Sequence, residues 1–495
     1  MNLHKPIQQT TAVIVSIFMS LSVFSEPVGM PDNRQIYSYI EDIVGFGSRH
    51  TGSQAMKNTT NYISGKFSEF GLENVDILKG NSQQWRIENW SLSFGNETIP
   101  SFYMRHTFYN GTTGSFSTPE KGLNADIVYV GNSKDLSGMD VKGKIVVADI
   151  VLGDIDTELL QDVSSFVYDP ENSIKGIEKL NPFTPNNYPY NMASAIEGGA
   201  VGFIGILSNY FDSNRFYNED ISYFISEDYH FDIPGLWLSK RDGDTLKALI
   251  QRSPGTQAKI VMKGLVEEVE YRTVVGHLKG QTDDILMVQS HHDSGFFGAV
   301  EDASGVAEVL ALAKYFSQQP QSQRNKSMMF VTMDTHFTDY AAHEDLATKV
   351  ILENNLNVLA NVTVEHIARE VEITDGQATL SGEVEPRLFI TSPSLLNMTA
   401  RAVKSHQYDR SMVIPTAVFA DDYGLPTDVG VIQLLTDIPV VSLISVPAYL
   451  YDMADTLDKV AFDELQPTAL LLADLLESMH HSPVDTFQKD KLLEQ

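Results

Sequence analysis

The chain has 495 residues, with 65 acidic against 35 basic side chains, and therefore a formal net charge of −30. No basic stripe is available to neutralise phosphates, so nucleic acid is not expected as a partner. There are no cysteines, which excludes disulfides, thiolate metal sites and Cys nucleophiles, and any metal must be held by His, Asp, Glu or water. The length exceeds one compact core and predicts two domains, or one large domain with an insert.

The N-terminus carries Lys5, an apolar run over residues 11–24, and the small residue Ser25 before a Glu-Pro pair. This order is typical of a secretory signal peptide cleaved near Ser25, and it predicts a periplasmic or secreted protein. An uncleaved membrane anchor is the alternative, but the run is shorter than the ~20 residues that a spanning helix needs. No later segment is long and apolar enough to span, so no membrane contact is expected after cleavage.

The chain divides into three parts that differ in predicted secondary structure. Residues 32–75 predict two helices, separated by a Gly/Ser-rich turn at 45–53. From about 120, short strands alternate with turns, with helices near 192–197 and 243–251. From 272, strands alternate with helices. The strands of that last part are expected at 273–278, 284–289, 327–333, 360–365, 387–391 and 438–444, and the helices at 304–316, 343–354, 396–406 and 462–479.

This alternation predicts an α/β fold with a mostly parallel sheet and helices on both of its faces. Reactive groups are then expected at the carboxyl ends of the strands. The middle part, which starts at about residue 120, contains a GKIVV strand at 143–147, a glycine-rich segment at 198–204 and IPGLWLS at 233–239. On these marks it resembles the protease-associated domain, a small β-rich insert that shapes access to a site without carrying chemistry. An unrelated α/β insert is the alternative.

The sharpest cluster of polar residues is His291-His-Asp-Ser294 at the end of a predicted strand. His291 can present its imidazole to a metal, while Asp293 holds the other ring nitrogen and fixes the tautomer. Glu301 stands just before the next helix, where a carboxylate can bind one metal or bridge two. The alternative is a polar strand end beside a helix cap, but the grouping favours a site.

The pattern H-x-D-S followed by G-A-x-x-D-A-S-G-V-A is similar to that of the co-catalytic zinc exopeptidases, the family twenty-eight metallopeptidases. That family includes bacterial leucyl aminopeptidases, aminopeptidase Y and glutamate carboxypeptidase. GFGSRHTGS at 45–53 and DTLDKV at 455–460 also fit it. The resemblance implies a zinc-exopeptidase-like domain in two parts, 26–118 and 266–482, around an insert at 119–265, with a signal peptide at 1–25 and a polar tail at 483–495.

The resemblance also implies where two zinc ions would be held. The first His ligand falls on His291 and its orienting partner on Asp293. The bridging carboxylate falls on Glu301, with Asp302 as the alternative. The carboxylate that follows a later apolar strand falls on Glu365, with His366 beside it as the alternative.

Other positions of the family pattern are lost. The general base and the zinc ligand that follows it become His336 and Phe337, and the last His ligand becomes Tyr451, whose phenol ionises only near pH 10. These losses fall on the ligands of one zinc and on the base. The surviving set of His291, Glu301 and Glu365 therefore predicts one Zn²⁺ per chain, with His336 as an added ligand or as the catalytic base.

Two further groups are weaker. Asp421 and Asp422, with Thr427 and Asp428, resemble the Ser-Asp segment of the family near its substrate pocket, and turn residues are the alternative. His343 is predicted to begin a helix at the surface. The function expected from the whole is an exported aminopeptidase-type metallopeptidase acting on peptides. The alternative is a catalytically inactive homologue that binds a peptide or another ligand in the same cleft.

Overall fold

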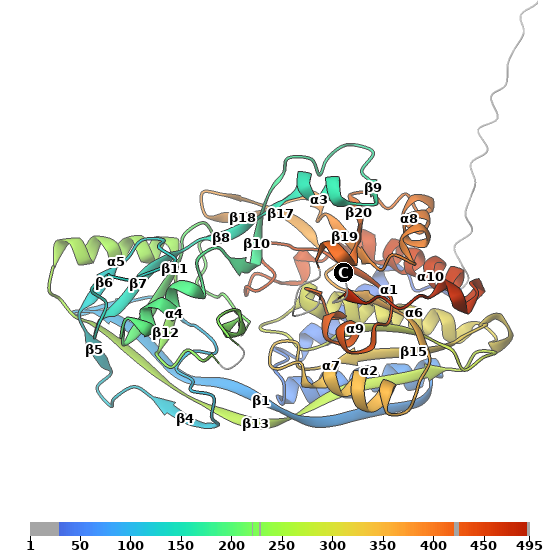
Figure 1. The fold of residues 1–495 in the computed structure, drawn as a ribbon, viewed down its shortest axis with the longest axis horizontal. Helices are drawn as coiled ribbons and strands as arrows, with labels where there is room; N and C mark the ends of the chain where they lie inside the picture. Colours follow the sequence, from blue (N-terminus) through green and yellow to red (C-terminus); the bar gives the residue numbers. More distant parts are fainter. Residues whose placement is uncertain (1–28, 220, 227–228, 420–424, 493–495) are drawn as a thin grey trace, which may run out of the picture.

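The computed structural model describes residues 29–219, 221–226, 229–419 and 425–492, and the statements below concern these residues. The predicted signal peptide, Asp421 and Asp422 lie outside them. The chain forms a larger lobe, in which helices cover a sheet, and a smaller β-rich lobe (Figure 1). Two long strands, β1 (Glu73–Phe94) and β13 (Ala258–Leu278), pair antiparallel and run through both lobes (Figure 1).

The main sheet has parallel strands at its centre and antiparallel pairs toward its edges. β14 (Ile285–His291) pairs in parallel with β15 (Ser327–Met333) and with β16 (Val358–Val364), and β16 pairs in parallel with β21 (Val440–Ile444). The α/β prediction is confirmed, with the parallel pairing concentrated at the centre. The sheet continues through β19 (Arg387–Thr391), β20 (Ser411–Pro415) and β9 (Phe166–Tyr168) on one side, and through β2 (Glu97–Ile99), β4 (Gly114–Ser117) and β5 (Leu123–Ala125) on the other.

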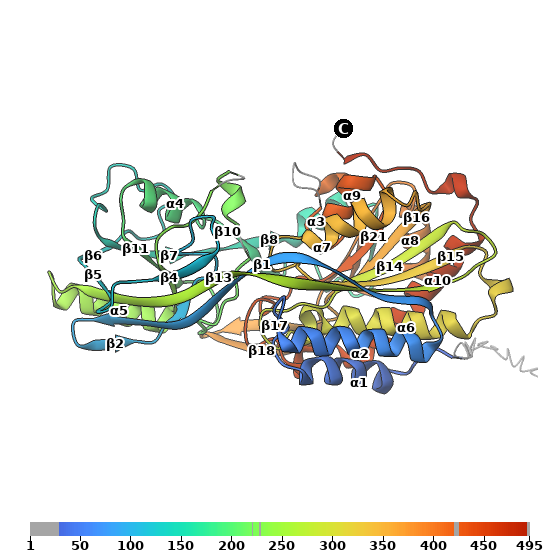
Figure 2. The same ribbon diagram turned by 90° about the horizontal axis from the view of Figure 1, so that it is seen from below.

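Helices cover both faces of this sheet, because its central strands are apolar on both sides and every residue of β14 is buried. On one face lie α1 (Asn33–Gly45), α2 (Gln54–Phe70) and α6 (Gly305–Gln318), and on the other lie α7 (Ala341–Asp345) and α9 (Gly430–Thr436) (Figure 2). α8 (Leu396–Ser405) packs against α10 (Leu465–His481). Ser53 caps the start of α2, and Gly71 ends that helix with a φ of +85° that suits glycine.

The smaller lobe is built on a second sheet, in the order β3-β12-β11-β7-β6. Its strands are β3 (Phe102–Tyr103), β6 (Ile127–Tyr129), β7 (Ile145–Ile150), β11 (Gly202–Leu207) and β12 (Gly235–Ser239), with α4 (Tyr190–Glu197) and α5 (Lys240–Arg252). Between the lobes run β8 (Leu152–Asp156) with β10 (Glu178–Pro185) and the hairpin of β17 (Arg369–Thr374) and β18 (Gln377–Val384), while α3 (Thr157–Val163) lies on the larger lobe beside β20 (Figure 1). Among the described helices, none has the length and apolar character needed to cross a membrane.

Candidate metal centre

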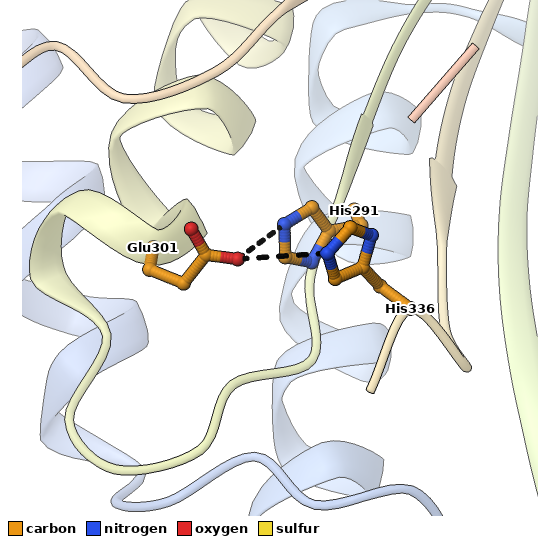
Figure 3. A group of neighbouring side chains, drawn as sticks. All are labelled: His291, Glu301 and His336. Atoms are coloured by element: carbon orange, nitrogen blue, oxygen red, sulfur yellow. Dashed lines mark ion pairs between the residues drawn. The ribbon is translucent and has the colours of Figure 1, made fainter. Parts of the chain in front are cut away.

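Three buried side chains meet where the central strands end. His291 is the last residue of β14, His336 follows the end of β15 by three residues, and Glu301 lies in the irregular segment Ala299–Ser304 that leads into α6. Figure 3 shows the carboxylate of Glu301 facing the imidazoles of both histidines. The sheet therefore brings together residues from three separate parts of the sequence.

The distances in this group suit a metal ion. His291 Nε2 lies 2.9 Å from Glu301 Oε1, and His336 Nε2 lies 4.0 Å from the same oxygen. The two imidazole rings stack with their centroids 4.2 Å apart. One ligand atom from each residue lies within 4.8 Å of the others. Although the atoms are close, His291 Nε2 and both Glu301 oxygens make no hydrogen bond. Two imidazole nitrogens and a carboxylate oxygen match the three protein ligands of catalytic zinc sites.

Each histidine of the group is oriented by a carboxylate on its other nitrogen. Asp293 Oδ1 lies 3.2 Å from His291 Nδ1, and Asp293 Oδ2 accepts a hydrogen bond from the backbone N–H of Phe337. Asp428 Oδ1 lies 2.8 Å from His336 Nδ1. A carboxylate on Nδ1 fixes the tautomer in which Nε2 is the metal-binding atom. Asp428 therefore orients His336. The sequence had left two interpretations of Asp428 open, a pocket residue or a turn residue.

His366, which the sequence offered as the alternative to Glu365, approaches Glu301. His366 Nε2 lies 2.5 Å from Glu301 Oε2, while its Nδ1 donates to the backbone carbonyl of Ser445. Glu365 Oε1 accepts a hydrogen bond from the backbone N–H of Asp428 at 3.4 Å. β16 ends at Val364, and two residues later His366 takes a positive φ of +59°, with its side chain toward Glu301.

Both carboxylate oxygens of Asp302, the alternative to Glu301, accept hydrogen bonds from nearby backbone N–H groups or a hydroxyl. Its Oδ1 accepts from the N–H groups of Gly305 and His366, and its Oδ2 accepts from the hydroxyl of Ser290. Glu301 is thus the carboxylate that faces the histidines.

Two buried side chains hold the loop that carries Glu301. Asp455 accepts hydrogen bonds from the backbone N–H groups of Val300 and Glu301, at 2.8 and 2.9 Å. The guanidinium of Arg49 donates to the carbonyls of His292, Phe297 and Gly298. Arg49 and Asp455 lie in two of the sequence segments that resemble the family. The composition of those segments did not predict these contacts.

Phe337 and Tyr451 stand where the family pattern has ligands of a second zinc. Both are buried, and their rings meet edge to face with centroids 5.7 Å apart. Phe183 and Phe216, from the range expected for the insert, pack against Tyr451. An aromatic cluster therefore fills this side of the site.

The segment expected to be an insert without chemistry also sends a carboxylate to the site. Glu219 Oε1 lies 3.6 Å from His336 Nε2 and accepts a hydrogen bond from the hydroxyl of Tyr451. No sequence signal marked Glu219, because it comes close only through the contact between the lobes.

The prediction that His343 lies at the surface is wrong. Its side chain is fully buried, and its Nε2 lies 3.7 Å from Asp428 Oδ1. His343, His336 and Asp428 form a second compact group of possible ligand atoms. The α7 segment that carries His343 packs toward the sheet. This histidine therefore lies in the interior, next to Asp428.

The pKa values of the site residues follow from burial and close opposite charges. Burial alone would raise the pKa of Glu301, but the imidazoles of His366 and His291 outweigh it and lower this pKa. Burial disfavours the charged form of His366, yet the Glu301 carboxylate raises its pKa to about 9. Burial, with the neighbouring Asp428 carboxylate, raises the pKa of Glu365 to about 8. Charge at the site is therefore concentrated on Glu301 and its imidazole neighbours.

With this geometry established, residues 273–335 match the family model described as peptidase family M28. Over these residues the chain is similar to peptidase family M28. The match ends at Thr335, directly before His336, where the chain departs from the family pattern. No curated protein matches the sequence.

Solved structures of zinc aminopeptidases and M28 peptidases share the fold. A zinc aminopeptidase from Bacillus subtilis aligns over 93% of this chain and 99% of its own, with a TM-score of 0.64 and 16% identity. A peptidase M28 precursor from Shewanella amazonensis SB2B aligns over 90% and 93%, with a TM-score of 0.66 and 19% identity. An aminopeptidase from Aneurinibacillus sp. strain AM-1 aligns over 90% and 93%, with a TM-score of 0.56 and 17% identity. The family match and these neighbours support a metallopeptidase-like hydrolase.

Proposed function

We propose that the protein is an exported aminopeptidase-type hydrolase of peptides that works with one Zn²⁺ held by His291, Glu301 and His336. The observation that carries the proposal is the convergence of these three buried ligand atoms, with a carboxylate orienting each histidine. Export rests on the signal-peptide pattern at 1–25.

When bound, Zn²⁺ supplies a water of lowered pKa and polarises the carbonyl of the scissile bond. His336 was a candidate for both ligand and base, and the geometry supports the ligand role, because its Nδ1 is engaged by Asp428 while its Nε2 faces Glu301. Proton transfer then falls to another group. We assign it to Glu219, whose carboxylate faces His336 Nε2 from outside the ligand set.

A narrow cavity of about 10 Å³, roughly the space of one water molecule, lies next to Glu301. Its walls include Tyr217, Phe296, Phe337 and Tyr451.

One specific observation favours the alternative, a homologue that binds peptides without cleaving them. Phe337 and Tyr451 replace two ligands of a two-zinc centre with buried aromatic rings. A protein that had kept only the binding cleft would tolerate these replacements.

Metal analysis and activity together test the proposal. Protein prepared without added metal should contain about one zinc per chain. His291→Ala should lose it, whereas Tyr451→Phe, which keeps the ring, should retain it. Aminoacyl anilides and dipeptides should be hydrolysed, and a chelator should abolish this activity until zinc is restored. Two zinc ions per chain, or none, contradict the one-metal centre, and bound zinc without turnover favours the binding protein.

A further inference from the structure

A buried arginine without an acidic partner lines a second cavity, beside the metal centre. Arg105 directly follows Met104 after β3 in the smaller lobe, and its side chain is only 3% exposed. The cavity has a volume of about 150 Å³. Its walls come from both lobes and from β1, and include His50, Trp85, Asp293 and Tyr217.

The contacts of Arg105 leave part of its guanidinium unused. Nη2 donates to the backbone carbonyl of Phe337 at 3.3 Å, and the group stacks over the ring of Tyr217 at 3.8 Å. Nη1 makes no hydrogen bond, and no described carboxylate lies within ion-pair distance of Arg105. Asn218 fixes the backbone by bonding to both the N–H and the carbonyl of Arg105.

A buried cation without an anion is costly, typically by several kcal/mol, in a protein interior. This chain has 65 acidic side chains, yet none of the described ones pairs with Arg105. Asp293 lines the same cavity, but its two oxygens are engaged by His291 and by the N–H of Phe337. The arrangement is therefore that of a cation held in place for an anion that arrives from outside.

The position of the cavity relates that anion to the metal centre. Phe337 lines the cavity and its ring meets the ring of His336 with centroids 5.0 Å apart. Asp293 lines it too, and bonds to His291. Tyr217 and Phe337 line both this cavity and the one next to Glu301, so an anion bound here lies beside the metal centre. Burial lowers the pKa of His50 on the cavity wall to about 4, so that imidazole is neutral at pH 7 and adds no second cation.

We propose that this cavity is a carboxylate-binding subsite in which Arg105 pairs with a carboxylate of the peptide. The proposal rests on the function proposed above and narrows its substrates to peptides with a carboxylate close to the scissile bond. Two sources share this chemistry, namely the C-terminal carboxylate of a dipeptide or tripeptide and an acidic side chain next to the first residue. Arginine suits either, since its planar fork can donate two parallel hydrogen bonds to one carboxylate.

The test measures binding to chelator-treated protein, so that it does not depend on turnover. Ala-Ala is compared with Ala-Ala-amide by isothermal titration calorimetry, and Ala-Glu-amide is compared with Ala-Gln-amide. A charged hydrogen bond typically contributes about 1.5–3 kcal/mol, so at least one of the two carboxylates should bind roughly 10- to 100-fold tighter than its amide counterpart. The pair that shows the preference identifies the source of the carboxylate.

Arg105→Gln should abolish the preference, and Arg105→Lys should retain part of it. The matched control is Arg86→Gln: Arg86 lines the same cavity but already pairs with Glu267 at 3.3 Å, so the preference should persist. Wild-type protein that binds acid and amide forms equally, or Arg105→Gln that keeps the full preference, overturns the proposal. If Arg105→Gln fails to fold, the wild-type comparison and Arg105→Lys still decide. Failure of the proposed function has a different signature: the preference is present, but the zinc-loaded protein does not hydrolyse the bound peptide.

Discussion

Glu308→Gln should stabilise the protein increasingly as the pH rises. Glu308 lies on α6 with its side chain fully buried, and neither of its oxygens has a hydrogen-bond partner. Burial raises its pKa well above the ordinary value of 4.5. The folded state then holds a proton that the unfolded state releases above pH 4.5, so this residue costs more stability at each higher pH until its folded pKa is reached.

The upper limit of the stability difference follows from the pKa of Glu308 in the unfolded state alone. Each pH unit above 4.5 adds at most about 1.4 kcal/mol, so the cost at pH 7 has an upper limit of about 3.4 kcal/mol. Glutamine keeps the shape and cannot ionise. The variant should therefore match wild type near pH 4.5 and exceed its stability by up to that limit at pH 7.

Denaturant unfolding of both proteins at pH 5, 6, 7 and 8, at fixed zinc concentration, measures the difference. Glu353→Gln, at an exposed position, is the control and should show no such trend. A stability difference for Glu308→Gln that does not change with pH would refute the reasoning.

Three further predictions concern the metal centre. Burial opposes protonation of His291 and His336, but nearby groups that include Asp428 raise the pKa of each well above 6.5, so zinc must displace protons and its affinity should increase with pH. Competition titrations at pH 6 and pH 8 check this, and equal affinities contradict it. Asp455→Asn should weaken zinc binding roughly 10- to 100-fold, because an amide oxygen and an NH₂ group cannot both accept from the Glu301 loop. The same titration applied to the exposed Asp458→Asn should show no change. Glu219→Gln should keep its zinc and lose roughly 10²- to 10⁴-fold in kcat, the range typical of a lost proton-transfer group. Loss of zinc from that variant in elemental analysis instead makes Glu219 a ligand.

The sequence predicts the centre of the fold well because predominantly apolar runs form strands buried on both faces. β14, β15 and β21 are of this kind. The long strand β1 escapes prediction for the opposite reason: most of its residues are exposed or half-buried, with no consistent alternation. Its ladder of backbone hydrogen bonds with β13 defines it, and that pairing has no counterpart in local composition.

At the site, spacing along one segment was enough to select His291, Asp293 and Glu301. Spacing along the sequence could not decide whether Glu365 or His366 faces the site. Neighbouring residues of an extended strand point to opposite faces, so a strand end that turns at one residue decides which side chain faces the site. Here the turn occurs at His366. Arg105 and Glu219 depend on how the lobes meet, and no local pattern contains that information.

His366 offers a physical reason why a centre with one metal can keep its central carboxylate charged and in place. In a two-metal centre, the bridging carboxylate has a cation on each oxygen. Here Glu301 Oε1 faces His291 and His336, while Oε2 faces His366 Nε2. Burial would keep His366 neutral, but Glu301 raises the pKa of this imidazole to about 9, so it is protonated at pH 7. Its Nδ1–H is held by the Ser445 carbonyl, which directs the Nε2–H at Glu301. An imidazolium thus provides on Oε2 the positive charge that a second ion would provide. In the proposed one-zinc centre, this imidazolium would take the place of the second zinc beside Glu301.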